Sequence, residues 1–223
     1  MTEARVNADG FGFGWFAQGL PERFVSPMPI WSDGNLPGLG RALRASTWVG
    51  NVRSATPGIP YGHGSNQPFA DAELLFLHNG YLGDFATLRS RIRAFIDAGV
   101  ENGIAGGTDS EYIFALLRHL LLDEDMPIDE ALLQLCHRLQ EWLGDTRALL
   151  NIVVADGERL YATRHALNAD CPSLYFTTDD EAFPGGLLVA SEPLTDSLYW
   201  KPVPAHHLLI LDRNEPPDLV PLS

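Results

Sequence analysis

Residues 149–164 read LLNIVVADGERLYATR, and this stretch carries the strongest sign of an antiparallel sheet. Two short apolar runs, 149–155 and 160–164, flank Asp156-Gly157, a dipeptide that favours a tight hairpin between antiparallel strands. Further short apolar strands are predicted downstream, at 174–178, 187–191 and 207–211. The C-terminal part of the chain is therefore expected to consist of antiparallel strands.

Helices are predicted immediately upstream of this hairpin, at 85–98, 110–122 and 127–143, where apolar residues recur at the helical period. A short helix is also expected at 36–45. Strands are predicted before them, at 11–16, 47–53 and 74–77. The strands thus form two groups separated by helices and do not alternate with them. This segregation predicts an α+β fold with two antiparallel sheets between helical layers, in a single domain spanning residues 1–223.

Residues 11–16, FGFGWF, alternate large aromatic side chains with glycine. The period of two is typical of a strand, and glycine in a strand interior often marks a close approach by another backbone. We therefore expect this strand to pack closely against a second element. The proline-bearing segment that follows, 21–37, is interpreted as a hairpin and loop.

Composition and charge exclude several classes of protein. The 223 residues include 45% hydrophobic and 20% charged residues, which is ordinary for a globular protein. The net charge of −14 lacks the basic footprint of a nucleic-acid-binding protein and argues against an anionic membrane surface. No apolar run approaches the ~20 residues of a membrane-spanning helix, and no signal core stands at the N-terminus, so a cytoplasmic protein is expected.

Metal and thiol chemistry have weak support. The histidines and carboxylates do not show the spacing of a metal site, so neither a metal nor another cofactor is expected. The only cysteines are Cys136, predicted to lie in the core of a helix, and Cys171, predicted to lie in a more exposed turn without an evident activating base.

Four short segments place polar groups where a strand ends or a helix begins, which is where rigid elements present functional groups. They are residues 7–12 (NADGFG), 52–58 (VRSATPG), 78–80 (HNG) and 107–111 (GTDSE).

Each candidate residue in these segments has a functional and a structural interpretation. Arg53 can offer a bidentate fork to a carboxylate, or form a structural ion pair. Asn79 and Gly80 can provide an amide and a backbone N–H to an oxyanion, whereas Asn-Gly is also the strongest short signal for a turn. Asp109 can receive an ammonium group, or serve in the first turn of a helix capped by Thr108 with Glu111. Taken singly, each residue favours its structural interpretation.

Together, in this order and spacing, the four segments resemble the class II glutamine amidotransferases, the N-terminal-nucleophile glutaminases. Residues 7–15 and 189–193 most resemble the ergothioneine-pathway γ-glutamyl amidohydrolases. The resemblance covers the chain from Asn7 onward and implies a four-layer αββα sandwich of the Ntn-hydrolase type.

The resemblance also implies a role for each residue that matches the family motifs. Arg53 corresponds to the arginine that holds the substrate α-carboxylate, and Thr56 to a threonine lining the same pocket. Asn79 and Gly80 correspond to the oxyanion donors, and Asp109 to the carboxylate that receives the α-ammonium. The loop 59–69 and the segment 21–37 are expected to border the side of the leaving amine.

The N-terminus departs from the family pattern. The family nucleophile is a cysteine directly after the initiator Met, whereas this sequence has Thr2, five residues before Asn7. We do not expect Thr2 to replace it, because the family's first strand has no room here. The chain as given is therefore expected to be inactive, either because the start was assigned at an internal Met or because catalysis has been lost.

Two functions follow from the resemblance and stay open. The first is hydrolysis of the γ-glutamyl amide bond of glutamine or a γ-glutamyl conjugate. The second is a catalytically dead module that binds glutamine or γ-glutamyl groups, or a regulatory subunit of a multichain amidotransferase. A separate synthase or peptidase subunit is a possible partner in either case.

Overall fold

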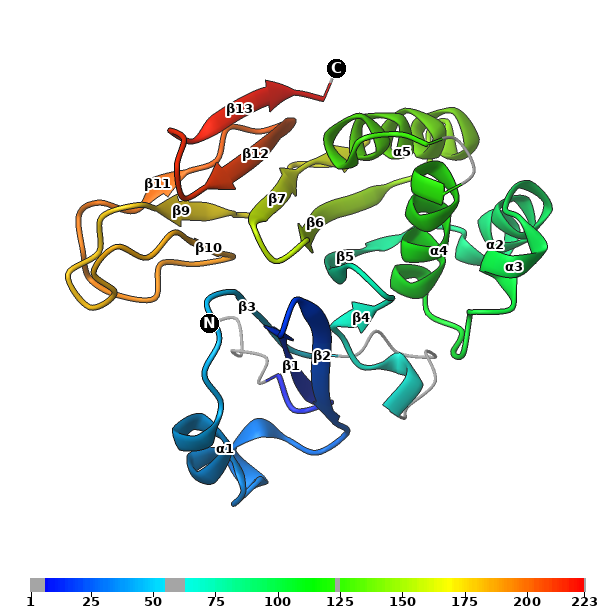
Figure 1. Ribbon diagram of the computed structural model, residues 1–223. Coiled ribbons are helices and arrows are strands. Elements are labelled where there is room, and N and C mark those ends of the chain that lie inside the picture. The colour runs from blue at the N-terminus through cyan, green and yellow to red at the C-terminus, as the bar shows by residue number, and fades with distance from the viewer. Residues whose placement is uncertain (1–6, 55–62, 123–124, 223) are drawn as a thin grey trace, which may run out of the picture.

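The computed structural model describes residues 7–54, 63–122 and 125–222 (Figure 1). The N-terminal half contains β1 (Phe11–Ala17), β2 (Leu20–Ser26), α1 (Leu36–Ala42), β3 (Trp48–Val52), β4 (Phe69–Ala70), β5 (Leu75–Leu82), α2 (Phe85–Phe95), α3 (Ala98–Glu101) and α4 (Asp109–Leu122). The C-terminal half contains α5 (Ile128–Leu143), β6 (Ala148–Ala155), β7 (Arg159–Arg164), β8 (Ala166–Leu167), β9 (Tyr175–Thr177), β10 (Leu188–Ala190), β11 (Lys201–Pro202), β12 (His207–Asp212) and β13 (Asp218–Pro221). Short 3₁₀ turns lie at Ile30–Ser32 and His63–Ser65.

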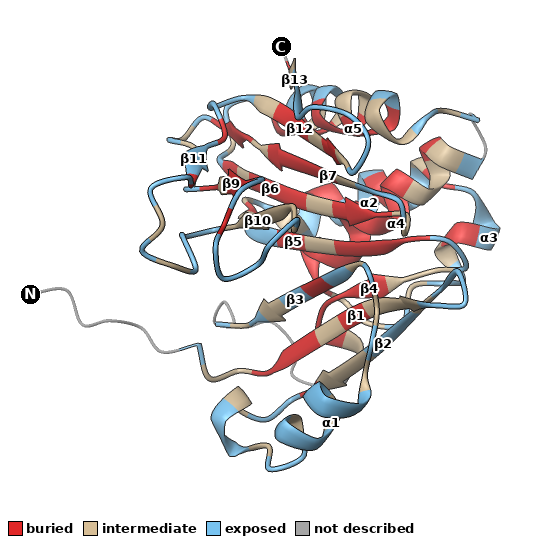
Figure 2. Ribbon diagram, turned by 60° about the vertical axis from the view of Figure 1, so that its left-hand side comes forward, coloured by how far each residue is buried: buried red, intermediate tan, exposed pale blue. Residues whose placement is uncertain are grey.

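The largest sheet has seven strands, in the order β13-β12-β7-β6-β5-β4 with β8 paired to β6. All its pairs are antiparallel, as segregated strands joined by hairpins require. Its central strands are largely buried (Figure 2). The predicted hairpin is confirmed, because β6 pairs with β7 in a register that sets Ala155 opposite Leu160.

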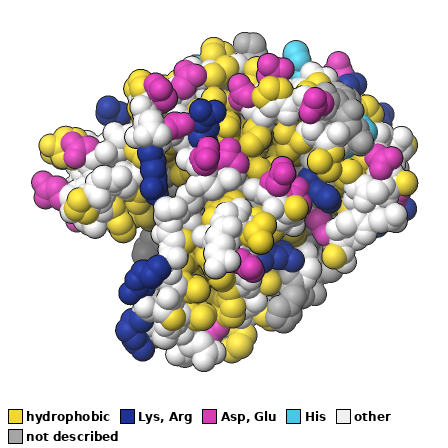
Figure 3. Space-filling view, in the orientation of Figure 1, with side chains coloured by type: hydrophobic (Ala, Val, Ile, Leu, Met, Phe, Trp, Pro, Cys, Tyr) yellow, Lys and Arg dark blue, Asp and Glu magenta, His cyan; other side chains and the backbone are white. Residues whose placement is uncertain are grey.

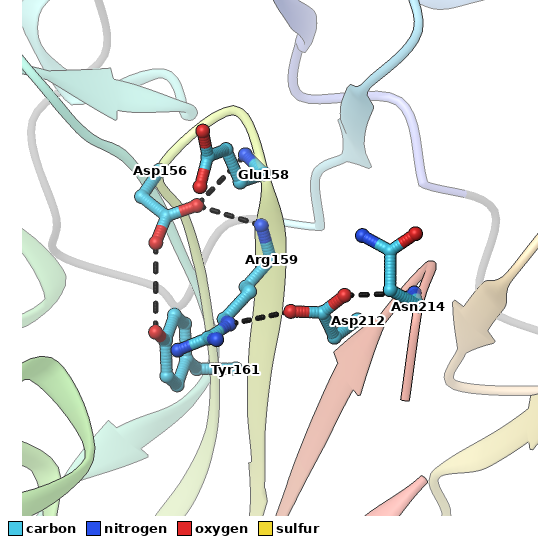
Figure 4. Close-up of polar contacts among 6 residues, drawn as sticks. All are labelled: Asp156, Glu158, Arg159, Tyr161, Asp212 and Asn214. Atoms are coloured by element: carbon cyan, nitrogen blue, oxygen red, sulfur yellow. Dashed lines mark hydrogen bonds and ion pairs between the residues drawn. The ribbon is translucent and has the colours of Figure 1, made fainter. Parts of the chain in front are cut away.

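The turn of this hairpin is stabilised by its own side chains (Figure 4). The Asp156 carboxylate accepts hydrogen bonds from the N–H groups of Glu158 (2.9 Å) and Arg159 (2.7 Å). Gly157 adopts φ 95°, a conformation that glycine tolerates without steric cost. Arg159 then reaches across to β12 and pairs with Asp212 at 2.7 Å. The turn therefore helps to align β7 with both neighbouring strands.

Helices α2, α4 and α5 cover one face of the large sheet and enclose the main core. Leu116, Leu117 and Leu120 of α4 have no exposed surface. Phe114 of α4 stacks on Phe76 of β5, with ring centroids 5.0 Å apart. Burial of one such side chain stabilises the fold by roughly 1.5–3 kcal/mol. This packing holds the start of α4 against β5, where the candidate site lies.

The predicted helix at 85–98 is divided in two. α2 ends at Phe95, and Asp97 adopts an extended conformation in which its carboxylate accepts a hydrogen bond from Gly99 N–H at 2.6 Å. Asp97 therefore caps a separate short helix, α3, because an aspartate side chain satisfies an N–H group that the helix leaves unpaired.

A second layer contains the three-stranded sheet β2-β1-β3, which faces the large sheet. The close approach predicted for residues 11–16 is confirmed at two glycines of β1. A Cβ on Gly12 would overlap the Gln67 carbonyl oxygen, and a Cβ on Gly14 would lie 2.8 Å from Leu75 Cδ2. Only glycine therefore lets β1 lie this near to the large sheet.

The remaining strands form a small sheet, β10-β9-β11, beside the large one. The predicted α+β architecture of stacked antiparallel sheets with helical layers is confirmed. The outer helical layer beyond β1 and β2 consists of α1, which buries none of its residues. The turn that Asn79-Gly80 favours in isolation does not form, because β5 continues through both residues and pairs them with Asn151 and Leu150.

The acidic side chains are spread over the surface and do not form one patch on the face shown in Figure 3. On the face seen in Figure 3, Asp and Glu side chains are scattered over the upper part, and Arg and Lys side chains stand between them. Within the described ranges, none of the helices combines the length and the apolar character that a membrane crossing demands.

Candidate active site

A polar cavity of about 140 Å³ lies where β3, β5 and the start of α4 meet. It unites residues from all four segments singled out in the sequence. Its lining residues are Asn7, Asn51, Val52, Arg53, Ser54, Ser65, Gln67, His78, Asn79, Gly80, Thr108, Asp109 and Ser110.

Arg53 enters the cavity from the end of β3. Its backbone is fixed, because Arg53 N–H donates to Gly10 O at 2.8 Å and Asp9 N–H donates to Arg53 O at 3.0 Å. The guanidinium Nη1 is buried and has no hydrogen-bond partner among the described residues. A buried donor without a partner costs free energy, typically about 1–3 kcal/mol, unless a ligand satisfies it. Arg53 therefore has the geometry of a ligand-binding arginine within the part of the chain that is described.

The middle of β5 presents one edge to the cavity. Along this edge the backbone of His78 forms two hydrogen bonds with the side chain of Gln67. The His78 N–H donates to Gln67 Oε1 at 2.5 Å, and Gln67 Nε2 donates to the His78 carbonyl at 2.9 Å. Leu82 N–H, four residues on, donates to Asp109 at 2.9 Å on the same edge. Backbone N–H groups alternate along a strand, so the Gly80 N–H points toward this edge as well.

Asn79 lines the same cavity from an exposed position on β5. Its side chain makes no hydrogen bond to any residue in the described ranges. Asn79 and Gly80 thus line the same cavity, where their amide and backbone N–H are available as hydrogen-bond donors.

Gly80 cannot be replaced by a larger residue without displacing its neighbours. A Cβ at this position would overlap the Leu149 carbonyl and lie 2.7 Å from His78 Nε2. The glycine therefore serves the close contact between β5 and β6, and not a tight turn.

Asp109 connects the start of α4 to β5. Its Oδ2 accepts the hydrogen bond from Leu82 N–H, and its Oδ1 accepts one from Ser110 N–H at 2.8 Å. The helix is capped instead by Thr108, whose hydroxyl accepts from Glu111 N–H at 3.2 Å. The capping box is only half formed, because the Glu111 carboxylate accepts from Ala105 and Gly106 N–H. Asp109 therefore does not serve as the helix cap. Its carboxylate borders the cavity and has lone pairs left to accept further hydrogen bonds.

His78 orders this corner of the site. Its Nε2 lies 2.8 Å from Leu149 O and its Nδ1 2.9 Å from Ser110 Oγ. A carbonyl only accepts, so Nε2 carries the proton and Nδ1 accepts from the Ser110 hydroxyl. Burial lowers the pKa of His78, and nearby Asp109 opposes this shift only in part. Burial therefore favours the neutral form of His78. The Ser110 hydroxyl lies closer to His78 Nδ1, at 2.9 Å, than to Asp109 Oδ1, at 3.4 Å.

Buried neutral histidines predict an acid-sensitive fold. Burial, followed by the influence of His206, lowers the pKa of His165 to about 4, and burial also lowers that of His78. An unfolded histidine has a pKa of about 6.5, so the unfolded chain binds more protons and stability falls as the pH drops below that value. The free energy of unfolding is expected to fall between about pH 7.5 and 5, with about 2 kcal/mol due to His165.

Urea unfolding at the two pH values measures this effect. His165→Gln should flatten the pH dependence, and the exposed His137→Gln should leave it unchanged. An equal pH dependence in all three proteins would contradict the assignment to His165.

The structure thus brings together four of the five predicted site residues: Arg53, Asn79, Gly80 and Asp109. Thr56 lies outside the described residues, as does the first part of the loop 59–69. Asn7 and His78 belong to segments that the sequence had already singled out. Gln67 was not predicted as a site residue. Its side chain binds the backbone of His78 in β5, and this contact arises only when the fold brings residues 67 and 78 together.

The two cysteines lie elsewhere. Cys136 is buried in α5, where burial raises the pKa of its thiol to about 12. Cys171 lies in the segment between β8 and β9 and does not line the cavity.

Comparison with known proteins agrees with this geometry. Residues 2–175 match the family described as glutamine amidotransferases class II. The chain is 33% identical over 204 residues to the γ-glutamyl-hercynylcysteine sulfoxide hydrolase of Mycobacterium tuberculosis strain H37Rv, covering 92% of this chain and 75% of that protein.

Two solved structures are similar in fold. One, a glutamine aminotransferase class-II domain protein from Silicibacter pomeroyi, has a TM-score of 0.77 and 26% identity, covering 95% of this chain and 91% of that one. The other, the glutamine phosphoribosylpyrophosphate amidotransferase of B. subtilis, has a TM-score of 0.67 and 14% identity, covering 97% of this chain and 43% of that one. It shows the Ntn-type fold alone. With the family matched over most of its length, the chain belongs to the class II glutamine amidotransferases.

Proposed function

We propose that the cavity binds the γ-glutamyl head of glutamine or of a γ-glutamyl conjugate and promotes hydrolysis of its amide bond. One observation supports this proposal. Asp109, Asn79, Gly80 and an arginine, Arg53, whose buried Nη1 has no hydrogen-bond partner among the described residues, line a single small cavity. The relatives named as γ-glutamyl hydrolases support the same chemistry.

The charges of the cavity match those of the ligand. A γ-glutamyl head carries one α-carboxylate and one α-ammonium. The planar guanidinium of Arg53 would hold the carboxylate, because its fork matches that group in two hydrogen bonds. Asp109, whose carboxylate borders the cavity, would receive the ammonium. The γ-carbonyl would then lie toward β5.

At β5, the Asn79 amide and the Gly80 N–H would stabilise the negative oxygen that forms when the γ-carbonyl is attacked. Collapse of this intermediate breaks the C–N bond and expels the amine. Water hydrolyses the remaining γ-glutamyl acyl group and releases glutamate. The ammonia is either released or taken up by a separate synthase subunit, and a peptidase subunit is the other possible partner. Co-purification of such a subunit would test the last alternative.

The nucleophile distinguishes the two functions that the sequence leaves open. Among the described residues, neither Cys136 nor Cys171 lines the cavity. A second candidate is therefore a module that binds γ-glutamyl groups without hydrolysing them. Glutamate release together with binding would support the hydrolase, and binding without release would support the module.

Arg53→Lys is expected to weaken glutamine binding although the charge is kept, because the planar fork is lost. The cost should be about 1.5–3 kcal/mol, the value for a hydrogen bond to a charged group. Calorimetric titration with glutamine measures it. Arg44→Lys, at an exposed arginine whose Nη1 contacts only nearby carbonyls, is the matched control. Equal affinity in both variants would remove Arg53 from the site.

Asp109→Asn is expected to weaken binding of glutamine but not of N-acetylglutamine, which lacks the α-ammonium. The asparagine oxygen can still accept from Leu82 N–H, so β5 and α4 should stay connected. The affinities of both ligands are measured in wild type and variant. An equal loss for both would mean that Asp109 acts only as a structural link.

A further inference from the structure

A second group of reactive side chains lies outside the cavity, where the segment before β9 meets the turn before β12. Cys171 Sγ lies 3.7 Å from Nε2 and 3.8 Å from Nδ1 of His206. His206 Nδ1 in turn lies 3.0 Å from Nδ1 of His165, the residue that follows β7. The sequence had suggested no base for Cys171, and the fold supplies one from a residue 35 positions away.

The backbone holds these three residues in place. His206 N–H donates to Arg164 O at 2.7 Å, and Leu222 N–H donates to His206 O at 2.9 Å. The Arg164 side chain donates to Pro172 O at 2.8 Å and to Val203 O at 2.6 Å. Arg164, the last residue of β7, therefore connects the segment that carries Cys171 to His206 and to its own neighbour His165.

The protonation of His165 follows from its burial, whereas His206 is exposed. His165 is buried, and the lowered pKa of about 4 keeps its ring neutral near pH 7. Two ring nitrogens 3.0 Å apart share one proton. If His206 takes the thiol proton on Nε2, its Nδ1–H can donate to the bare Nδ1 of His165. In this arrangement Cys171 is the nucleophile, His206 is the base and His165 orients the base.

The surroundings leave the thiol of Cys171 accessible. Cys171 is partly exposed, and the Arg164 guanidinium is bonded to the carbonyl of the next residue, Pro172. Among the other ionisable neighbours, Asp170 is exposed and His207 directs its Nδ1 to Ala205 O. A partly exposed cysteine within reach of an imidazole is typical of a reactive thiol.

We propose that Cys171, His206 and His165 form a second site, a thiol that exchanges with disulfides of low molecular weight. Cys171 transfers its proton to His206, and the thiolate attacks one sulfur of the small disulfide. The bond between the two sulfurs of the small molecule breaks, and a mixed disulfide forms on Cys171. The released thiolate takes up the proton from His206, so no other oxidant is needed.

The test uses the whole chain and dipyridyl disulfide, whose released thione is followed by absorbance. We expect one thiol to react rapidly in the folded protein and none in Cys171→Ala, because Cys136 is only 1% exposed. The wild-type rate should remain nearly level down to about pH 6.5, whereas the rate of an unassisted thiol falls about tenfold for each unit below its pKa of about 8.5.

His206→Asn separates an activated thiol from one that is merely exposed. Asparagine tolerates the left-handed backbone of this position, where φ is 58°. We expect the variant to react about five to ten times more slowly near pH 7 and to match wild type near pH 9.5, since a few per cent of an ordinary thiol is ionised near neutrality. His207→Asn is the matched control and should react like wild type.

Three outcomes would overturn the proposal: a wild-type rate that follows an unassisted thiol, equal rates in His206→Asn and wild type, or modification of Cys136. The wild-type pH profile decides the question even if the variant folds poorly. Cys171→Ala should bind glutamine like wild type, so this site is tested independently of the γ-glutamyl cavity.

Discussion

Gly80→Ala is expected to lower the midpoint of thermal unfolding by roughly 10 °C. The new methyl group would overlap the Leu149 carbonyl and lie 2.6 Å from its carbon atom, so β5 and β6 would have to separate. Overpacking costs typically 1–3 kcal/mol and more where backbone must move, and each kcal/mol shifts the midpoint of a chain this long by about 2–4 °C.

Circular dichroism during heating measures the midpoint. Gly38→Ala is the matched control, because a Cβ there meets no atom within 4 Å and alanine favours the helix in which it lies. The variant Gly80→Ala should also release glutamate more slowly, since separation of β5 from β6 would displace the N–H of residue 80 at the cavity. A midpoint within about 1 °C of wild type would show that β6 yields easily at Leu149.

Asn79→Ala is expected to lower the rate of glutamate release about 100- to 1,000-fold while leaving glutamine affinity unchanged. The Asn79 amide has no partner among the described residues, and in the proposed reaction it meets negative charge only in the transition state. Loss of such a donor therefore affects kcat and not ground-state binding.

The rate is measured as glutamate released by the form of the protein that hydrolyses glutamine, and the affinity by calorimetry. Asn102→Ala, at an exposed position after α3, serves as the control. A variant that loses affinity but keeps kcat would make Asn79 a binding residue. In a protein that binds without hydrolysis, equal affinity in variant and wild type is the expected result.

Local sequence predicted most elements because their signals are short-range. The Asp156-Gly157 turn is determined by residues within the hairpin, and its side chains hold it as Figure 4 shows. The glycines of β1 predicted a close approach by another element. They did not predict that the backbone approaching Gly12 is that of Gln67. The short strands β4, β8, β11 and β13 were missed, because their pairing partners lie in other parts of the chain and two to four residues carry little periodicity.

The Asn79-Gly80 dipeptide illustrates where local signals mislead. In isolation it favours a turn, yet pairing with β6 on one edge and the Gln67 side chain near the other keep it in a strand. Tertiary pairing here outweighs the local preference. The same contacts leave the Gly80 N–H at the cavity, which a turn would not have done.

The sequence alone determined the α+β class, the order of the main elements and the four segments that carry the candidate site. These features depend on periodicity, turn residues and motif order, which are properties of residues close together in the chain. Only the tertiary structure decided which interpretation of each residue applies. Among the described residues, the Nη1 of Arg53 has no hydrogen-bond partner, Thr108 caps the helix in place of Asp109, and Cys171 lies near the imidazole of His206. These outcomes depend on burial and on contacts between distant residues, and no local pattern encodes either of them.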